Sequence, residues 1–140
     1  MSDRVTVRLT HRFAATPERV FDAWLDPRTA GKWLFATPTG KITRCEIDPQ
    51  VGGKFFIVRV DGDEFEHIGE YLEIDRPRRL VFRFTVPRLS AEYSRVTLEF
   101  TPLAGGCELR LTHENVLADY ADRVPEGWTM ILNGLEKNLT

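Results

Sequence analysis

Three consecutive segments in the second half of the chain alternate between apolar and polar residues, and this pattern constrains the fold more than any other feature. A period of two is typical of β-strands with one buried face, because successive side chains point to opposite sides of a sheet. The segments therefore predict neighbouring antiparallel strands with one apolar and one solvated face. Their apolar positions are Leu80, Phe82, Phe84 and Val86, then Val96, Leu98 and Phe100, then Cys107, Leu109 and Leu111.

The rest of the sheet follows from the same pattern and from turn residues. Residues 5–13 alternate strictly and predict a first strand. Residues 42–114 are rich in β-branched and aromatic residues, which favour strands. Stretches of Gly, Pro and Asp divide this region into six strands, joined mainly as a meander. These stretches are residues 49–53, 61–63, 76–78 and 104–106.

Helix signals occur in two places. Thr16-Pro17 and Asp26-Pro27 each combine a capping residue with a proline suited to the first helical turn. They predict two short helices after the first strand, the second ending near Leu34. Beyond Pro125, apolar residues fall at helical spacing and predict a long amphipathic helix at the C-terminus. That stripe consists of Trp128, Ile131, Leu132, Leu135 and Leu139.

A sheet with one apolar face needs a cover, and the C-terminal helix carries the long apolar stripe that can supply it. We therefore predict an α+β fold, in which a curved seven-stranded antiparallel sheet wraps around this helix. No repeat or linker divides the chain, so residues 1–140 are expected to form one domain. A bent sheet gripping one helix can leave a cavity, and we expect glycines such as Gly69 to add bulges that increase the bend.

Composition narrows the function. Lys and Arg number 19 and Asp and Glu 21, for a net charge of −2, and their mixed order does not make the basic face that nucleic acids need. No apolar segment is long enough to enter a membrane, so a cytoplasmic location is expected. Cys45 and Cys107 have no metal-binding spacing. We expect no metal, no cofactor and no residue of a common catalytic motif.

The order of elements and several short motifs together resemble the helix-grip superfamily of steroidogenic-acute-regulatory lipid-transfer domains, birch-pollen allergen and polyketide cyclases (SRPBCC). Within it, the chain resembles the bacterial single-domain homologues of the activator of the ninety-kilodalton heat-shock protein's ATPase. The motifs are residues 16–24 (TPERVFDAW), Asp26-Pro27 leading to Trp33, residues 52–55 (GGKF), 69–71 (GEY), 77–82 (PRRLVF), 94–98 (SRVTL) and 111–114 (LTHE), and Gly127-Trp128.

The resemblance implies a hydrophobic cavity but does not fix a function. Similar proteins serve as ligand carriers, polyketide cyclases, self-resistance proteins or chaperone regulators, so fold and activity are separate questions. The chain does not show the additional N-terminal domain through which eukaryotic activators contact their chaperone, which weakens a chaperone role. We expect a small apolar or aromatic ligand, such as a lipid or a polyketide, as partner.

Aromatic residues from both short helices, the sheet and the last helix are candidates for lining such a cavity. They are equally suited to filling a core, since each buries a large apolar area. Trp33 and Phe35 lie at the end of the second short helix and in the loop of residues 35–40, which contains Pro38 and Gly40 and is suited to a lid. The candidate ligand-binding residues are Trp24, Trp33, Phe35, Phe55, Tyr71, Phe82, Phe84, Phe100, His113, Trp128 and Leu132.

The three histidines are the natural acid–base candidates, because imidazole titrates near neutral pH. His11 and His113 lie in phase with inward-facing apolar residues. Antiparallel pairing of the first and last strands places His11 opposite Leu109 and His113 opposite Val7, so the two rings are roughly 14 Å apart. Each is expected at a strand end, half solvated or bonded to a carbonyl, with a pocket role as the alternative. His67 stands among acidic residues and is expected at the surface.

Three functions remain open. A ligand-binding module predicts an apolar cavity with few polar groups. A cyclase- or hydratase-like enzyme needs an inward acid–base group, for which His113 and Tyr71 are candidates. A chaperone regulator or other protein-binding domain predicts a filled interior and an exposed apolar patch around residues 33–35. Self-association through strand edges or the last helix is a further alternative.

Overall fold

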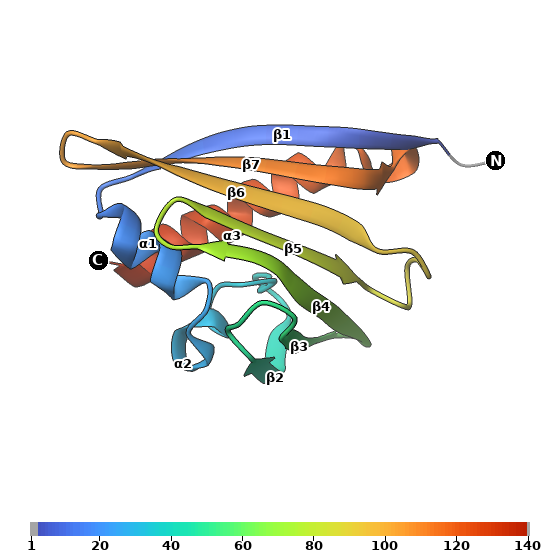
Figure 1. The fold of residues 1–140 in the computed structure, drawn as a ribbon. Coiled ribbons are helices and arrows are strands. Elements are labelled where there is room, and N and C mark those ends of the chain that lie inside the picture. Colours follow the sequence, from blue (N-terminus) through green and yellow to red (C-terminus); the bar gives the residue numbers. More distant parts are fainter. Residues whose placement is uncertain (1–2, 140) are drawn as a thin grey trace.

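A computed structural model describes residues 3–139 and has one seven-stranded antiparallel sheet curved around a C-terminal helix (Figure 1). The strand order is β1-β7-β6-β5-β4-β3-β2. The elements are β1 (Arg4–Phe13), α1 (Pro17–Ala23), α2 (Pro27–Ala30), β2 (Lys41–Ile47), β3 (Lys54–Asp61), β4 (Asp63–Asp75), β5 (Arg79–Thr85), β6 (Ser94–Leu103), β7 (Gly106–Leu117), the 3-10 turn η1 (Ala118–Tyr120) and α3 (Arg123–Leu139).

The predicted α+β helix-grip architecture is confirmed, including the number and order of strands and the two short helices between β1 and β2. Strands β2 to β7 form a meander, and β1 returns to pair with β7. The predicted register is also right, since His11 faces Leu109 and His113 faces Val7. The chain departs from the sequence prediction at the helix ends. Helix α2 stops at Ala30, not near Leu34, and α3 begins two residues before Pro125.

Side-chain caps explain where the short helices begin. The Thr16 Oγ1 atom accepts a hydrogen bond from the Arg19 backbone N–H at 3.3 Å, and the Asp26 carboxylate accepts one from the Arg28 N–H at 2.9 Å. Each cap is followed by a proline, whose fixed φ suits the first turn. These two turns redirect the chain from the end of β1 toward the opposite edge of the sheet, where β2 begins (Figure 1).

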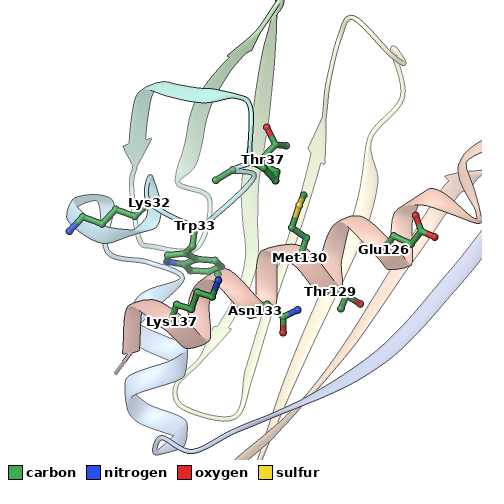
Figure 2. Close-up of a pocket in the computed structure, with 11 residues that line it drawn as sticks. Lys32, Trp33, Thr37, Glu126, Thr129, Met130, Asn133 and Lys137 are labelled. Atoms are coloured by element: carbon green, nitrogen blue, oxygen red, sulfur yellow. The ribbon is translucent and has the colours of Figure 1, made fainter.

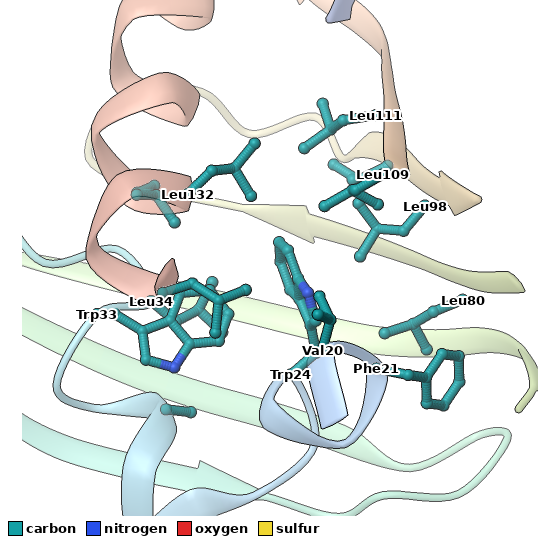
Figure 3. Close-up of a cluster of buried hydrophobic side chains, with 14 of the residues drawn as sticks. Val20, Phe21, Trp24, Trp33, Leu34, Leu80, Leu98, Leu109, Leu111 and Leu132 are labelled. Carbon is teal, nitrogen blue, oxygen red and sulfur yellow. The ribbon is translucent and has the colours of Figure 1, made fainter. Parts of the chain in front are cut away.

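The space between the sheet and α3 is filled mainly by aromatic and leucine side chains. Figure 3 shows Trp24 reaching from the end of α1 into this space. Its ring meets Trp33 edge to face at 4.9 Å and lies 6.2 Å from the Trp128 ring. The candidate aromatics at positions 24, 33, 35, 55, 71, 82, 84, 100 and 128 are all buried, as is Leu132. The centre of the molecule is therefore a packed core.

The curvature of the sheet comes from irregular pairing, but not at the position expected from the sequence. Gly69 pairs regularly with Phe55 on β3 and Phe84 on β5, so the predicted bulge there is wrong. The register shifts lie between Tyr71 and Glu73 on β4, and on β1 and β2. The missing side chain of Gly69 instead leaves room for the Phe55 ring, which would lie 2.1 Å from an added Cβ atom.

Candidate functional site

A pocket of about 390 Å³ opens at the end of the molecule where α3 begins. Its walls come from β5, the segment between β5 and β6, the end of β7, η1 and the first turns of α3. The pocket extends across the sheet, since Arg59 and His67 lie on β3 and β4 whereas Arg4 and Val116 lie on β1 and β7. Its apolar walls are Phe84, Val86, Leu89, Val116, Leu117 and Val124.

The rim of the pocket is held by polar contacts of the two adjoining loops. The Thr85 hydroxyl donates to the Ser90 carbonyl at 2.8 Å and fixes the segment after β5. On the opposite side, the Asn115 amide donates to the Tyr93 carbonyl at 2.8 Å. Asn115 has φ 65°, a left-handed conformation that Asn tolerates better than most residues, and it lies where the β1–β7 register shifts. This irregularity directs the last residues of β7 along the pocket.

A chain of hydrogen bonds connects α3 to the pocket wall through His113. The Trp128 indole N–H, which can only donate, lies 3.0 Å from His113 Nδ1, so Nδ1 carries the lone pair. His113 Nε2 therefore carries the proton and donates to the Ser94 hydroxyl at 2.7 Å. The Ser94 hydroxyl can in turn donate to the Phe84 carbonyl at 3.4 Å. The expectation that His113 is half solvated is wrong, because it is buried and both ring nitrogens are bonded.

This tautomer determines what the Ser94–His113 pair can do chemically. A serine nucleophile needs a histidine nitrogen with a free lone pair to take its proton. Here the nitrogen facing Ser94 already carries a proton, and the other lone pair accepts from Trp128. The pair therefore has the spacing of a catalytic serine–histidine dyad, but here the histidine donates the hydrogen bond and the serine hydroxyl accepts it. Its arrangement fixes the orientation of the ring and does not activate the hydroxyl.

His67 is the clearest correction to the sequence analysis. It was expected at the surface, yet its side chain is buried against Phe35, whose ring stacks on it at 4.2 Å and 16°. Its Nδ1 atom lies 3.3 Å from the Ile57 carbonyl, which can only accept. Burial, and secondarily the nearby Arg59 charge, lower the pKa of His67 from 6.5 to about 4. His67 is therefore a neutral group in the pocket wall.

Both buried histidines are expected to stay neutral well below pH 6.5. Burial also lowers the pKa of His113 to about 4. Between pH 6.5 and 4 the unfolded chain binds two protons that the native protein excludes, so stability should fall through this range by up to about 3 kcal/mol per histidine, at ~1.4 kcal/mol per pKa unit. NMR titration of the imidazole Cε1–H signals tests this directly. Titration of both rings near pH 6.5 would contradict the buried, bonded arrangement.

The segment before β2 does not form the exposed apolar patch that the protein-binding alternative predicts. Trp33, Leu34 and Phe35 are 2%, 4% and 5% exposed, so the surface that a protein-binding role requires here is absent from the described residues. Phe35 adopts φ 60°, which is strained for a bulky residue. Its carbonyl accepts a hydrogen bond from Arg59 Nη1 at 3.2 Å, and its ring packs on His67. These contacts hold the segment inward, over β3 and β4.

The candidate residues divide into two groups in the structure. Phe84 and His113 line the pocket, and Trp128 lies directly behind His113. The others pack in the core beside it, where burial raises the pKa of the Tyr71 hydroxyl above its ordinary value. Several residues that line the pocket were not predicted from the sequence, among them Arg59, Ser94, Val124 and Gly127. The sequence does indicate that Arg59 points inward, because it continues the alternation of the inward-facing Phe55 and Ile57.

A second hollow lies on the opposite side of α3, between its outer face and the segment of residues 32–38 (Figure 2). Its volume is larger, about 730 Å³. Most of its side chains are exposed, including Glu126, Thr129 and Asn133 along the helix. Small-molecule sites are typically enclosed and mostly apolar. The pocket beside Phe84 and His113 has several buried side chains in its lining, whereas Trp33 is the single buried residue among the described ones that line the outer groove.

No group of three or more His, Cys, Asp or Glu side chains within residues 3–139 is placed to hold a metal ion. In the same part of the chain, no helix combines the length and the apolar character needed to cross a membrane.

The curved sheet, the gripped helix and the pocket at its N-terminal end define a helix-grip domain, a fold that commonly binds hydrophobic ligands. Residues 14–140 match the family model described as Activator of Hsp90 ATPase homolog 1-like protein, and the chain belongs to this family. No curated protein matches it.

Solved structures of bacterial proteins share this architecture. A Chromobacterium violaceum protein has 26% identity and a TM-score of 0.88, with 96% of each chain covered. A Rhizobium loti protein has 24% identity and a TM-score of 0.83, with 98% of each chain covered. A protein from Aeromonas hydrophila, described as AHSA1-like, has 21% identity and a TM-score of 0.81, covering 95% of this chain and 90% of its own. The last two support the fold alone.

Proposed function

We propose that this protein binds a small apolar or aromatic molecule in the pocket lined by Phe84, Val116 and Val124. The observation that carries the proposal is the combination of apolar walls with an inward His113 whose two ring nitrogens are bonded within the protein. A volume of about 390 Å³ lies within the roughly 300–1,000 Å³ typical of small-molecule sites. A few fixed polar groups among apolar walls are also typical of such sites, where they orient the ligand.

The hydrogen bonds of the pocket favour binding over catalysis. An acid–base enzyme in this space needs a group that can exchange a proton with its substrate. His113 uses both nitrogens within the protein, and the tautomer directs its proton to Ser94. The burial of Trp33 and Phe35 likewise removes the surface on which a protein-binding role was based. Ligand binding is the function that these contacts support best.

Gly127 offers a way to fill the pocket without disturbing the core. It lines the pocket on α3, one helical turn from Val124, and a Cβ atom built there meets no atom within 4 Å. Gly127→Leu should therefore place its side chain in the pocket. The helix itself should gain up to about 1 kcal/mol, because Gly is a poor helix former.

The test uses the uncharged fluorescent probe N-phenyl-1-naphthylamine. The wild-type protein should bind it saturably and gain in melting temperature, because a ligand selective for the native state stabilises that state. Gly127→Leu should weaken binding by roughly tenfold or more, since ligand and side chain compete for one space. Its melting temperature without probe should be unchanged or higher.

Thr129→Leu is the matched control, because it adds the same side chain to the exposed outer groove of the same helix. This variant should bind the probe like the wild type. If the probe fails to bind the wild-type protein, or if Thr129→Leu blocks binding and Gly127→Leu does not, the pocket is not the ligand site.

A further inference from the structure

Arg59 is the one feature of the pocket that a purely apolar ligand leaves unexplained. It projects from the inner face of β3 and is half-buried, with its guanidinium 4.8 Å from the Phe65 ring centre. Nη1 donates to the Phe35 carbonyl, whereas the Nε atom is buried and has no hydrogen-bond partner. Across residues 3–139, no ion pair within 4.0 Å involves Arg59.

Holding a half-buried guanidinium here without a carboxylate partner is unfavourable, because the charge loses part of its hydration. Burial lowers the pKa of Arg59, and the more distant Asp61 opposes this effect only in part. Arginine nevertheless stays protonated in proteins. The protein thus holds a permanent charge in the wall of the pocket, and within the described residues this charge has no carboxylate partner.

The other charges of the pocket do not neutralise Arg59. Glu92 is the single acidic residue of the lining and forms an ion pair with Arg4. Arg123 adds a second positive charge at the start of α3, and His67 and His113 contribute none. The described lining therefore carries net positive charge, which favours an anionic ligand group.

We infer that the ligand is an amphipathic monocarboxylic acid, whose carboxylate pairs with the Arg59 guanidinium while its apolar body lies along Phe84, Val124 and Gly127. The inference rests on the proposed function and adds the chemical class of the ligand. Arginine suits this role because its N–H groups pair with planar carboxylates and its charge strengthens each hydrogen bond.

The experiment compares decanoate with decanol as competitors for N-phenyl-1-naphthylamine in the wild-type protein. Decanoate should displace the probe at roughly tenfold lower concentration, as expected for one charge-assisted hydrogen bond. Arg59→Met, which keeps an unbranched apolar side chain, should remove this preference and leave displacement by decanol within about twofold. Arg59→Lys should restore part of it. Arg110→Met, on the exposed outer face of β7, should behave like the wild type.

A second readout needs no variant. The NMR signal of the Arg59 Nε–H should shift on addition of decanoate and stay unchanged with decanol. Equal displacement by both compounds, or an unshifted Nε–H signal, would overturn the carboxylate assignment while probe binding still supports the pocket. Failure of the probe itself to bind would refute both proposals.

Discussion

Trp128→Ala should destabilise the protein by about 3–5 kcal/mol, the range for removing a buried aromatic side chain. The indole is 3% exposed and packs against Trp24, Phe35 and His113. Its loss also leaves the buried His113 Nδ1 atom without a donor. Urea unfolding at pH 7 measures the change in free energy.

Trp128→Phe separates packing from hydrogen bonding at this position. It keeps an aromatic ring but removes the indole N–H, so we expect a smaller loss of about 1–3 kcal/mol. Met130→Ala, two residues further along α3 and 38% exposed, serves as the control and should change stability little. A Trp128→Ala loss no larger than that of the Met130 variant would contradict the role of Trp128 as a link between core and pocket.

Gly69→Ala should destabilise the protein strongly, with a loss of about 3 kcal/mol. The new Cβ atom would lie 2.1 Å from the Phe55 ring and 2.8 Å from the Arg83 carbonyl oxygen. The ring is itself buried, so it has little room to move. Thermal and urea unfolding should both show the loss.

A smaller side chain at Phe55, whose ring lies against Gly69, tests whether steric overlap causes the loss of stability in Gly69→Ala. Phe55→Leu in the Gly69→Ala background should recover part of the stability, because it removes the nearest ring atoms. Gly134→Ala is the matched glycine control, since its Cβ atom would meet Trp33 at an ordinary 3.4 Å within α3. The packing explanation fails if the two losses at Gly69 and Phe55 simply add.

The regular part of the fold could be predicted because it repeats. Alternation along β5, β6 and β7 determines both the buried face and the register, and the same logic placed His113 opposite Val7. His67 was misplaced because the acidic residues around it suggested a solvated strand. The better signal was its alternation with Gly69 and Tyr71, which occupy the next two inward-facing positions of the same strand. In a strand, the face of a residue follows from its phase and not from its sequence neighbours.

The site itself depends on contacts between distant segments, which periodicity does not reveal. Phe35 lies over His67 because Arg59 bonds its carbonyl and the rings stack, although the three belong to separate segments. The tautomer of His113 follows from Trp128, which is 15 residues away. Aromatic composition indicated a cavity near these rings, but the rings largely fill the centre. The open space lies beside them, where α3 carries Val124 and Gly127.

The most direct test of the account is to locate a bound probe by NMR. With methyl-labelled protein and N-phenyl-1-naphthylamine, we expect intermolecular NOEs to the methyl groups of Val86, Val116 and Val124, which line the pocket. Contacts to Met130 and Thr37 instead would place the probe in the outer groove and contradict a ligand site beside His113.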